Sequence, residues 1–255
     1  MNDAKTLSEL ISMSRELGRP ENDYVVLGEG NTSARIDDSF FYVKASGKYL
    51  RDSDENTFIK VKLPEAVAIL DKGSLTDDQI KAELAAVCAD TDNRLRPSIE
   101  TTFHAYLLSL PGVNFIGHTH ATAVNALTCS NNAEALISGR ICPDEIVYCG
   151  IEPLFMEYSD PGLELGRQIR EKIAEYSKRN GCNPKVILIR NHGIIAIGAN
   201  AHEVEAITAM YCKTCRILAG AVNFGGVHFM SQSNVDRIYT RPDEDQRKQQ
   251  FKASK

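Results

Sequence analysis

Apolar and polar residues follow two periods along this chain, one typical of helices and one typical of strands. Apolar residues repeat at helical spacing in residues 7–17, 80–88, 103–110, 162–176 and 202–219. Strand-like runs occupy residues 24–27, 40–44, 58–62, 113–117, 145–148, 186–189 and 194–197. Hairpins and strand–helix units are mixed, and this mixture predicts one three-layer α/β/α domain around a central mixed, largely antiparallel sheet.

The length of the chain and the absence of a linker bound the domain organisation. A chain of 255 residues is long enough for one large α/β domain or two small ones. No low-complexity segment divides it, so we expect one domain over residues 1–236. Residues 237–255 are too charged to extend the core, and we expect a polar tail that is disordered or laid across a neighbouring chain.

Composition excludes several classes of protein. The net charge is −5 with both signs interspersed, and no basic block predicts a nucleic-acid surface. No apolar leader and no run of about eighteen apolar residues supports secretion or a membrane span. The 7 cysteines lie mostly in apolar segments, which is typical of reduced thiols in a cytoplasmic protein. Cys212 and Cys215 fall within a predicted helix, and we expect them to pack in the core.

Three histidines form a candidate metal site. His118 and His120 end an apolar run, and alternate residues of a strand project to the same side, so both imidazoles can face one point. His192 lies at the tight turn between two predicted strands. Three imidazoles are the ligand set of a catalytic zinc site with an open position. A polar pair at a strand end explains His118 and His120 equally well when they are considered alone.

A glycine-rich turn at residues 28–33 reads Gly-Glu-Gly-Asn-Thr-Ser and lies between two predicted strands. Glycine lets the backbone approach an oxyanion closely, and Asn31 and Ser33 add side-chain donors. The turn is not a Walker loop, because no Gly-Lys-Ser/Thr follows and a strand comes next. An ordinary hairpin turn is the simpler alternative.

Residues 96–104 combine a predicted helix start with a carboxylate. We expect Ser98 to cap the helix, leaving amide donors at its positive end, where a phosphate would be stabilised. Glu100 is either a carboxylate favoured by the helix dipole or the base that an enolisation needs beside a metal-bound carbonyl. We expect His104, one turn later, to be a buried structural histidine that hydrogen-bonds to the backbone.

Taken in order, these segments resemble the class II aldolase/adducin-head family over roughly residues 5–222. Residues 30–33 resemble its Gly-Asn-x-Ser phosphate loop, and Ser46-Gly47 resembles its second phosphate contact. Residues 97–100, Pro-Ser-Ile-Glu, resemble its Ser-Ser-Glu segment. His118, His120 and His192 fall on its three zinc-binding histidines. Five motifs in register make coincidence a poor explanation.

The resemblance implies a site and a reaction. It implies zinc, or another divalent metal, on the three histidines, with Glu100 as the catalytic acid/base. It assigns the phosphate of a sugar phosphate, with Lys44 as a further contact, to Gly30, Asn31, Ser46, Gly47 and Ser98. The implied reaction cleaves a ketose 1-phosphate into dihydroxyacetone phosphate and an aldehyde through a metal-stabilised enediolate. The implied assembly is a cytoplasmic homotetramer with the active site near a subunit boundary.

The chain departs from the family pattern at one position and lacks one expected residue. Ile99 stands where a second serine is usual, which would remove one phosphate donor. Glu rather than Asp at position 100 argues against the epimerase branch. The tyrosine that donates a proton in fuculose-phosphate aldolase has no counterpart after His120, and Tyr239 is a candidate by position only. These features are most like the aldolase portion of bifunctional rhamnulose-phosphate aldolase/dehydrogenase proteins.

Two other functions stay open at this point. A dehydratase or a sugar-acid phosphate decarboxylase uses the same enediolate, so the site residues do not separate these lyases from an aldolase. A non-catalytic adducin-like binding head would keep the fold. Adducin heads lack the three metal-binding histidines, so the sequence favours an enzyme over a binding head.

Overall fold

A seven-stranded mixed sheet with the order β3-β2-β1-β4-β7-β6-β5 forms the centre of the computed structural model, which describes residues 3–90 and 95–243. All neighbouring strands are antiparallel except β5 and β6. The strands are β1 (Asn31–Arg35), β2 (Phe40–Lys44), β3 (Phe58–Lys62), β4 (Phe115–Thr119), β5 (Leu154–Met156), β6 (Val186–Ile189) and β7 (Gly193–Gly198). The predicted mixed, largely antiparallel sheet is confirmed.

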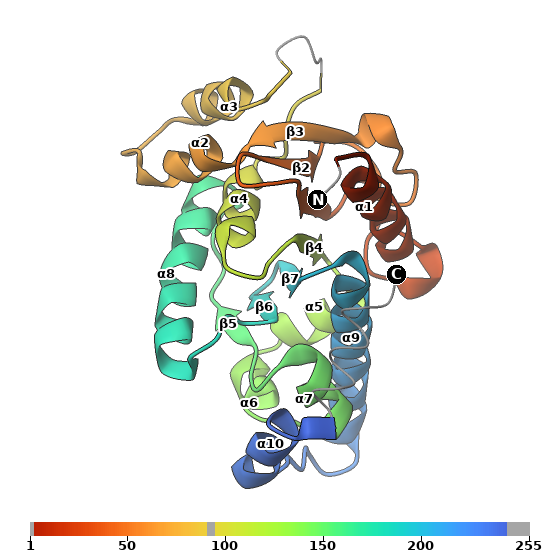
Figure 1. Ribbon diagram of the computed structural model, residues 1–255. Coiled ribbons are helices and arrows are strands. Elements are labelled where there is room, and N and C mark those ends of the chain that lie inside the picture. Colours follow the sequence, from red (N-terminus) through yellow and green to blue (C-terminus); the bar gives the residue numbers. More distant parts are fainter. Residues whose placement is uncertain (1–2, 91–94, 244–255) are drawn as a thin grey trace.

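Helices cover both faces of this sheet. The helices are α1 (Asp3–Leu17), α2 (Leu63–Ala68), α3 (Asp77–Ala86), α4 (Thr101–Ser109), α5 (Thr122–Thr128), α6 (Ala133–Ile137), α7 (Pro143–Cys149), α8 (Leu163–Asn180), α9 (Ala201–Asn223) and α10 (Gln232–Tyr239). Figure 1 shows α2, α4 and α8 on one side of the sheet and α1 and α9 on the other. The three-layer α/β/α architecture is therefore confirmed. In the described part of the chain, no helix is long and apolar enough to cross a membrane.

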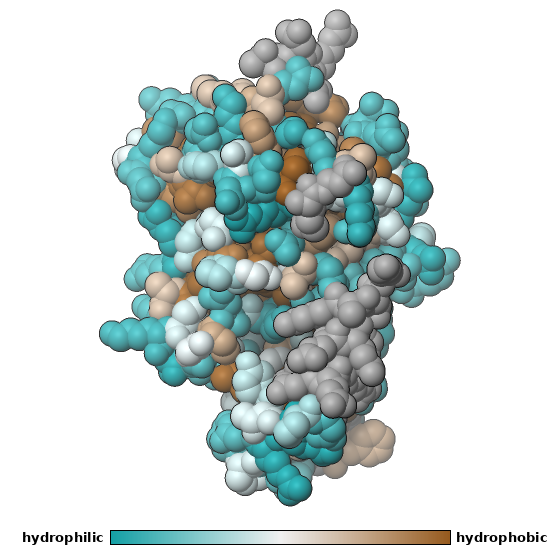
Figure 2. Space-filling model, in the orientation of Figure 1, coloured by the Kyte–Doolittle hydropathy of each residue, from teal (hydrophilic) through white to brown (hydrophobic). Residues whose placement is uncertain are grey.

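The core consists of two hydrophobic clusters, one on each face of the sheet. On β7, Ile195 and Ile197 belong to the cluster under α4 and α8, whereas Ile194 and Ala196 belong to the cluster under α1 and α9. Because both faces are covered, β6 and β7 are continuous apolar runs rather than alternating ones. On the molecular face shown in Figure 2, hydrophobic side chains are scattered among hydrophilic ones.

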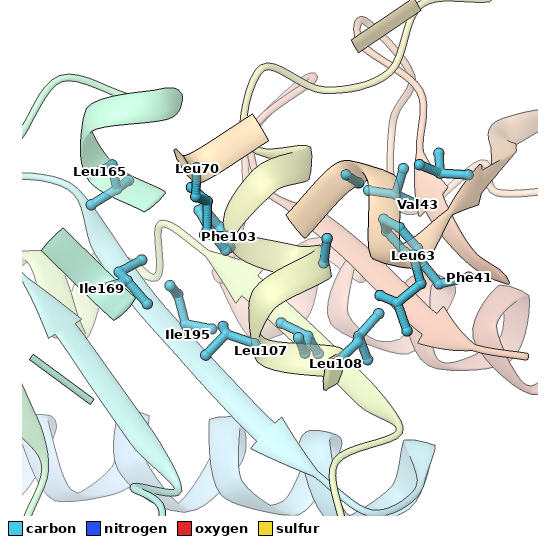
Figure 3. Close-up of a cluster of buried hydrophobic side chains, with 14 of the residues drawn as sticks. Phe41, Val43, Leu63, Leu70, Phe103, Leu107, Leu108, Leu165, Ile169 and Ile195 are labelled. Carbon is cyan, nitrogen blue, oxygen red and sulfur yellow. The ribbon is translucent and has the colours of Figure 1, made fainter. Parts of the chain in front are cut away.

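Helix α4 is wedged between α8 and the sheet. Its side chains Phe103, Leu107 and Leu108 are fully buried. Figure 3 shows Leu107 beside Ile195 of β7 and Phe103 beside Leu70, with Leu108 on the side of Leu63. Burying side chains of this size contributes about 1.5–3 kcal/mol each. The helix carries Glu100 immediately before its first turn, so this packing fixes the carboxylate relative to the strands.

Two predicted strands are wrong. Residues 145–148 lie within α7, where Pro143 at the first turn and two acidic residues favour a helix start. Residues 24–27 form no strand and include Leu27, which has a φ of 55°. Both are runs of only four residues, a length at which periodicity does not distinguish a strand from a helix or a loop.

The other predicted helices and strands are confirmed to within a few residues at their ends. Thr76 caps α3 through a reciprocal capping box with Gln79. Cys212 and Cys215 are buried within α9, as expected. Strand β1 was missed, because it lies partly in the segment expected to be a glycine-rich turn, and α2, α6, β5 and α10 were not predicted either. Helix α10 crosses position 237, where we expected the polar tail to begin, and residues 244–255 of that tail lie outside the described residues.

The first prediction concerns Gly193, where β7 passes closest to β4. A Cβ at this position would lie 2.4 Å from the carbonyl oxygen of Thr119, so a methyl group has to push two paired strands apart. We expect Gly193→Ala to lower the free energy of unfolding by about 1–3 kcal/mol, measured by denaturant titration. Gly73→Ala is the control, because nothing lies within 4 Å of its added Cβ. Equal stability of the two variants would contradict the strand packing described above.

Candidate metal centre and acid/base site

The three predicted ligands converge on one point. His118 lies near the end of β4, His120 directly follows that strand, and His192 directly precedes β7. The Nε2 atom of His118 is 3.2 Å from that of His120 and 3.3 Å from that of His192. Zinc–nitrogen distances of about 2.0–2.1 Å in a tetrahedral site place ligand nitrogens about 3.3 Å apart. The spacing therefore fits one tetrahedral divalent ion.

The turn before β7 aims His192 at β4. Asn191 has a φ of 54°, a left-handed conformation that asparagine tolerates better than most residues. The turn closes with a hydrogen bond from the His192 backbone N–H to the Ile189 carbonyl at 3.2 Å. The strand pairing of β4 with β7 then brings this turn beside His118 and His120.

All three imidazoles are held in the neutral form that binds a metal. Burial lowers the pKa of His118 to about 3, helped by the neighbouring His120, and lowers that of His192 to about 4. Burial also lowers the pKa of His120. His118 Nδ1 donates to the Ile194 carbonyl at 3.0 Å, which leaves the lone pair on Nε2 facing the other two histidines. Three neutral imidazole nitrogens that converge on one buried point are a donor set that fits a divalent ion.

Glu100 lies beside these nitrogens. It is 5% exposed, with Oε2 3.6 Å from His118 Nε2 and Oε1 3.5 Å from His192 Nε2. The Asn31 side-chain amide donates to Oε2 at 2.6 Å, whereas the buried Oε1 has no hydrogen-bond partner among the described residues. One oxygen is thus fixed and the other is free at the metal centre, as a group that exchanges a proton with a bound molecule requires.

Asn31 connects the glycine-rich turn to the acid/base. Its amide also donates to Ser98 Oγ at 3.2 Å, and its Oδ1 contacts His104 Nε2. His104 is buried as expected, but its partners are side chains rather than the backbone, because Nδ1 pairs with Ser33 Oγ at 2.7 Å. The two residues that the sequence suggested as anion donors, Asn31 and Ser33, therefore also hold the Glu100 environment in place.

Ser98 does not cap helix α4. The helix begins at Thr101, with Glu100 at the capping position, and Ser98 Oγ instead accepts from the Glu100 backbone N–H at 3.2 Å. The reason is local, since Thr101 N–H and its hydroxyl both bond to the Ser98 carbonyl, which makes a tight turn ahead of the helix. The predicted helix start was therefore wrong by two residues, and this turn is what orients Glu100.

The second predicted phosphate loop lies against the same segment. Ser46 N–H donates to the Arg96 carbonyl at 2.9 Å, and Gly47 has a φ of 77°, a conformation that favours glycine. Gly30 has a φ of 67°, and a Cβ there would lie 2.5 Å from the His118 carbonyl oxygen. The glycine at position 30 is thus required for the loop to approach β4.

Lys44 ties the two loops together. It is 2% exposed, and its ammonium donates to the Gly28 carbonyl at 3.1 Å and to the Lys48 carbonyl at 2.5 Å. Burial lowers its pKa to about 8, an effect that the negative charge of Glu100 partly opposes. The carboxylate of Glu100 is therefore close enough to Lys44 to change the pKa of this lysine.

A cavity of about 490 Å³ opens beside the histidines. His120 and His192 line it together with residues that the sequence analysis did not select, namely Asp23, Glu29, Thr122, Asn125, Cys129 and Asn191. Glu29 lies in the glycine-rich turn, and Asn125 lies one helical turn beyond His120. Their nearness in sequence to predicted site residues was the one available signal, and it did not indicate which side chains face the cavity.

Tyr239 is not brought to this site within one chain. It lines a different cavity beside Ile197 and Gly198, at the opposite end of β7 from His192. Its hydroxyl donates to Cys182 Sγ at 3.8 Å. Within its own subunit Tyr239 therefore cannot donate a proton at the metal centre.

Comparison with known proteins identifies a family and several relatives of this chain. The family model for the class II aldolase and adducin N-terminal domain matches residues 8–219. An uncharacterized oxidoreductase, YuxG of Bacillus subtilis, is 26% identical over 86% of this chain, but the match spans 30% of that protein's length. Methylthioribulose-1-phosphate dehydratase of Bacillus pumilus is 27% identical, with 81% of this chain and 88% of the relative covered. The 3-oxo-tetronate 4-phosphate decarboxylase of Haemophilus influenzae is 27% identical over 79% of this chain and 83% of its own length.

Solved structures share the fold. An N-terminal class II aldolase domain from Thermoplasma acidophilum superposes with a TM-score of 0.68 at 22% identity, covering 84% of this chain and 93% of that domain. An L-fuculose 1-phosphate aldolase superposes with a TM-score of 0.68 at 17% identity, covering 94% of this chain and 96% of that enzyme. At this level of identity, the likeness establishes the fold alone.

The second prediction concerns metal content. We expect protein prepared without chelator to hold about one divalent ion per chain. His120→Ala should lose most of this metal, because two imidazoles leave the tetrahedron half filled. His202→Ala is the control, since that histidine is exposed and pairs with Glu205 on α9. Elemental analysis that finds full metal in His120→Ala would remove the assignment.

The third prediction concerns protons. Histidines with the ordinary pKa of about 6.5 would together release about two protons when they bind zinc at pH 6. Because burial lowers the pKa of His118 to about 3 and that of His192 to about 4, they are already deprotonated at pH 6. We expect calorimetric zinc titrations in buffers of different ionisation enthalpy to show almost no proton release at pH 6. Zinc affinity should fall only as the pH approaches 4, and release of about two protons would contradict the burial argument.

Proposed function

Because the chain belongs to the class II aldolase and adducin N-terminal domain family, we propose that it is a metal-dependent sugar-phosphate lyase. Its proposed reaction cleaves a ketose 1-phosphate into dihydroxyacetone phosphate and an aldehyde. The observation that carries the proposal is the free Oε1 of Glu100, buried 3.5 Å from His192 Nε2 while Asn31 holds the other oxygen. A carboxylate placed so is an acid/base beside a Lewis acid, and it is poorly explained as a helix-start residue alone.

The three histidines prepare the site for a divalent ion such as zinc. His118 and His192 stay neutral on binding, and the hydrogen bond from His118 to Ile194 keeps one imidazole in a fixed orientation. A divalent ion held there supplies Lewis-acid stabilisation of the negative charge that develops when the carbon–carbon bond breaks. The open cavity beside His120 leaves room for the substrate to reach it.

Glu100 moves the proton in this scheme. In the cleavage direction the Glu100 carboxylate accepts the proton that the C4 hydroxyl loses as the carbon–carbon bond breaks, and it delivers this proton to the carbon of the three-carbon fragment; in the condensation direction the same proton moves back. The Asn31 amide stabilises the carboxylate and keeps Oε2 from rotating toward the substrate carbon. His104 contacts Asn31 Oδ1 and keeps the Asn31 side chain in that orientation. Burial lowers the pKa of His104, so this imidazole stays neutral.

The two loops bind the phosphate in the proposed complex. Gly30 and Gly47 allow close backbone approach, and Ser46 and Ser98 supply hydroxyl donors. Asn31 donates to the phosphate by giving up its bond to Ser98 while it keeps the bond to Glu100. Lys44 adds a positive charge and holds both loops through their carbonyls. Ile99 is 46% exposed here, so one hydroxyl donor of the family pattern is replaced by an apolar surface. The resemblance also makes a cytoplasmic homotetramer part of this proposal, with Tyr239 as a residue for a neighbouring subunit.

A dehydratase of a ketose 1-phosphate is the second candidate. Methylthioribulose-1-phosphate dehydratase covers 81% of this chain at 27% identity, whereas the fuculose-phosphate aldolase is 17% identical. The histidines, Glu100 and the phosphate loops serve either reaction. A decarboxylase has similar support from its 27% identical relative. A binding head without chemistry is disfavoured, because it has no need for three converging neutral imidazoles.

The fourth prediction tests Glu100. Glu100→Gln should keep its metal but lose turnover by about a hundred- to ten-thousand-fold, because the amide cannot exchange the proton. Glu164→Gln is a matched control on an exposed position of α8. Steady-state kinetics and elemental analysis of the same preparations check both halves. Activity of Glu100→Gln within a few-fold of the wild type would leave Glu100 as a helix-start carboxylate.

The fifth prediction concerns the substrate. Metal-replete protein is incubated with a panel of ketose 1-phosphates and with the matching unphosphorylated sugars, and dihydroxyacetone phosphate and dehydrated products are measured. We expect dihydroxyacetone phosphate from at least one ketose 1-phosphate and no comparable turnover of its unphosphorylated form. A dehydrated product without carbon–carbon cleavage would replace the aldolase by the dehydratase. Equal activity on phosphorylated and unphosphorylated sugars would contradict the phosphate loops.

A further inference from the structure

Asn125 lies beside the candidate metal centre and is not part of the ligand set. It belongs to α5 and is separated from His120 by five positions. Its side-chain amide donates to the His192 carbonyl at 3.2 Å and reaches the His120 carbonyl at 3.5 Å. One amide group therefore joins the backbones of two of the three candidate ligands, which come from different strands.

These two backbone positions lie beyond the strand pairing. Thr119 with Ile194 is the last register pair between β4 and β7 on this side of the sheet. His120 directly follows Thr119, and His192 lies two residues before Ile194. The Asn125 amide bridges these two positions beyond the last register pair, so it sets how far apart the two histidine backbones lie.

The orientation of this amide is determined by its surroundings. A flipped amide would point Oδ1 at both carbonyl oxygens, and like partial charges would repel. In the observed orientation Oδ1 is buried and has no hydrogen-bond partner among the described residues. An unsatisfied buried oxygen lowers stability. An apolar residue of the same size would avoid this cost, so the asparagine is better explained by the two carbonyls it joins than by stability.

We propose that Asn125 is a positioning residue that sets the affinity and geometry of the metal centre by joining the backbones of His120 and His192. The inference rests on the metal site of the proposed function. It adds a residue outside the ligand set that acts through the backbone rather than through an imidazole nitrogen. Hydrogen bonds in this outer position typically change metal affinity by about 10–100-fold.

The chain offers a matched control at the other end of the same strand pair. Asn114 precedes β4, and its side-chain amide donates to the Ala199 carbonyl, just after β7, at 3.0 Å. It is also a half-buried asparagine that joins the ends of β4 and β7. Substituting it removes a comparable hydrogen bond without touching the histidines.

The experiment measures zinc affinity by competition with a chromophoric chelator, without any substrate. The variants are Asn125→Leu, which keeps the volume, Asn125→Ala, in case the leucine is not accommodated, and Asn114→Leu. We expect zinc affinity to fall about 10–100-fold in both Asn125 variants and to stay within about threefold of wild type in Asn114→Leu. The visible absorption of the cobalt-substituted Asn125 variants should also shift, because the angle between two ligands changes. A structural role alone would leave that spectrum unchanged.

Two results would overturn the inference. One is wild-type zinc affinity and an unchanged cobalt spectrum in Asn125→Ala, whatever its thermal stability. The other is an equal loss of affinity in Asn114→Leu, which would make the effect one of general stability. Failure of the wild-type protein to bind zinc at all would overturn the metal site itself, and that result is read separately.

Discussion

The close approach of three neutral imidazoles is the constraint on which the rest of the site depends. Their Nε2 atoms lie 3.2 and 3.3 Å apart in a region that excludes water from His118 entirely. Burial keeps them uncharged, so they cannot be separated by protonation near neutral pH. Three buried, neutral imidazole nitrogens at this spacing match the ligand set of a divalent ion.

The sheet and one helix hold the three imidazoles and Glu100 in place. The β4–β7 pairing fixes His118 and brings the Asn191–His192 turn beside it, and Gly193 permits the close approach. Helix α4 is clamped in the core and delivers Glu100 from the other direction. A chain of contacts from Asn31 to His104 then links the glycine-rich turn to that carboxylate. The three histidines, Glu100 and the glycine-rich turn are thus connected by direct contacts in the folded chain.

The sequence predicted the parts of the site that depend on local periodicity. His118 and His120 follow from strand alternation, and His192 follows from its place between two apolar runs. The orientation of Glu100 was not predictable, because the turn at Ser98 depends on Thr101 and not on the usual capping pattern. The strands predicted at residues 24–27 and 145–148 were wrong, because a run of four residues carries too little periodicity to distinguish a strand from another element. Asn125 escaped notice because its role depends on two carbonyls that only the folded strands bring together.

A crystal structure of the zinc-loaded protein, with anomalous scattering recorded at the zinc edge, tests the central claim most directly. The account predicts one strong anomalous peak per chain, about 2.0–2.1 Å from the Nε2 atoms of His118, His120 and His192. The Glu100 carboxylate should lie beside the open position of the ion, still bonded to Asn31. A peak at another place, or one that touches only one or two of these histidines, would contradict the account.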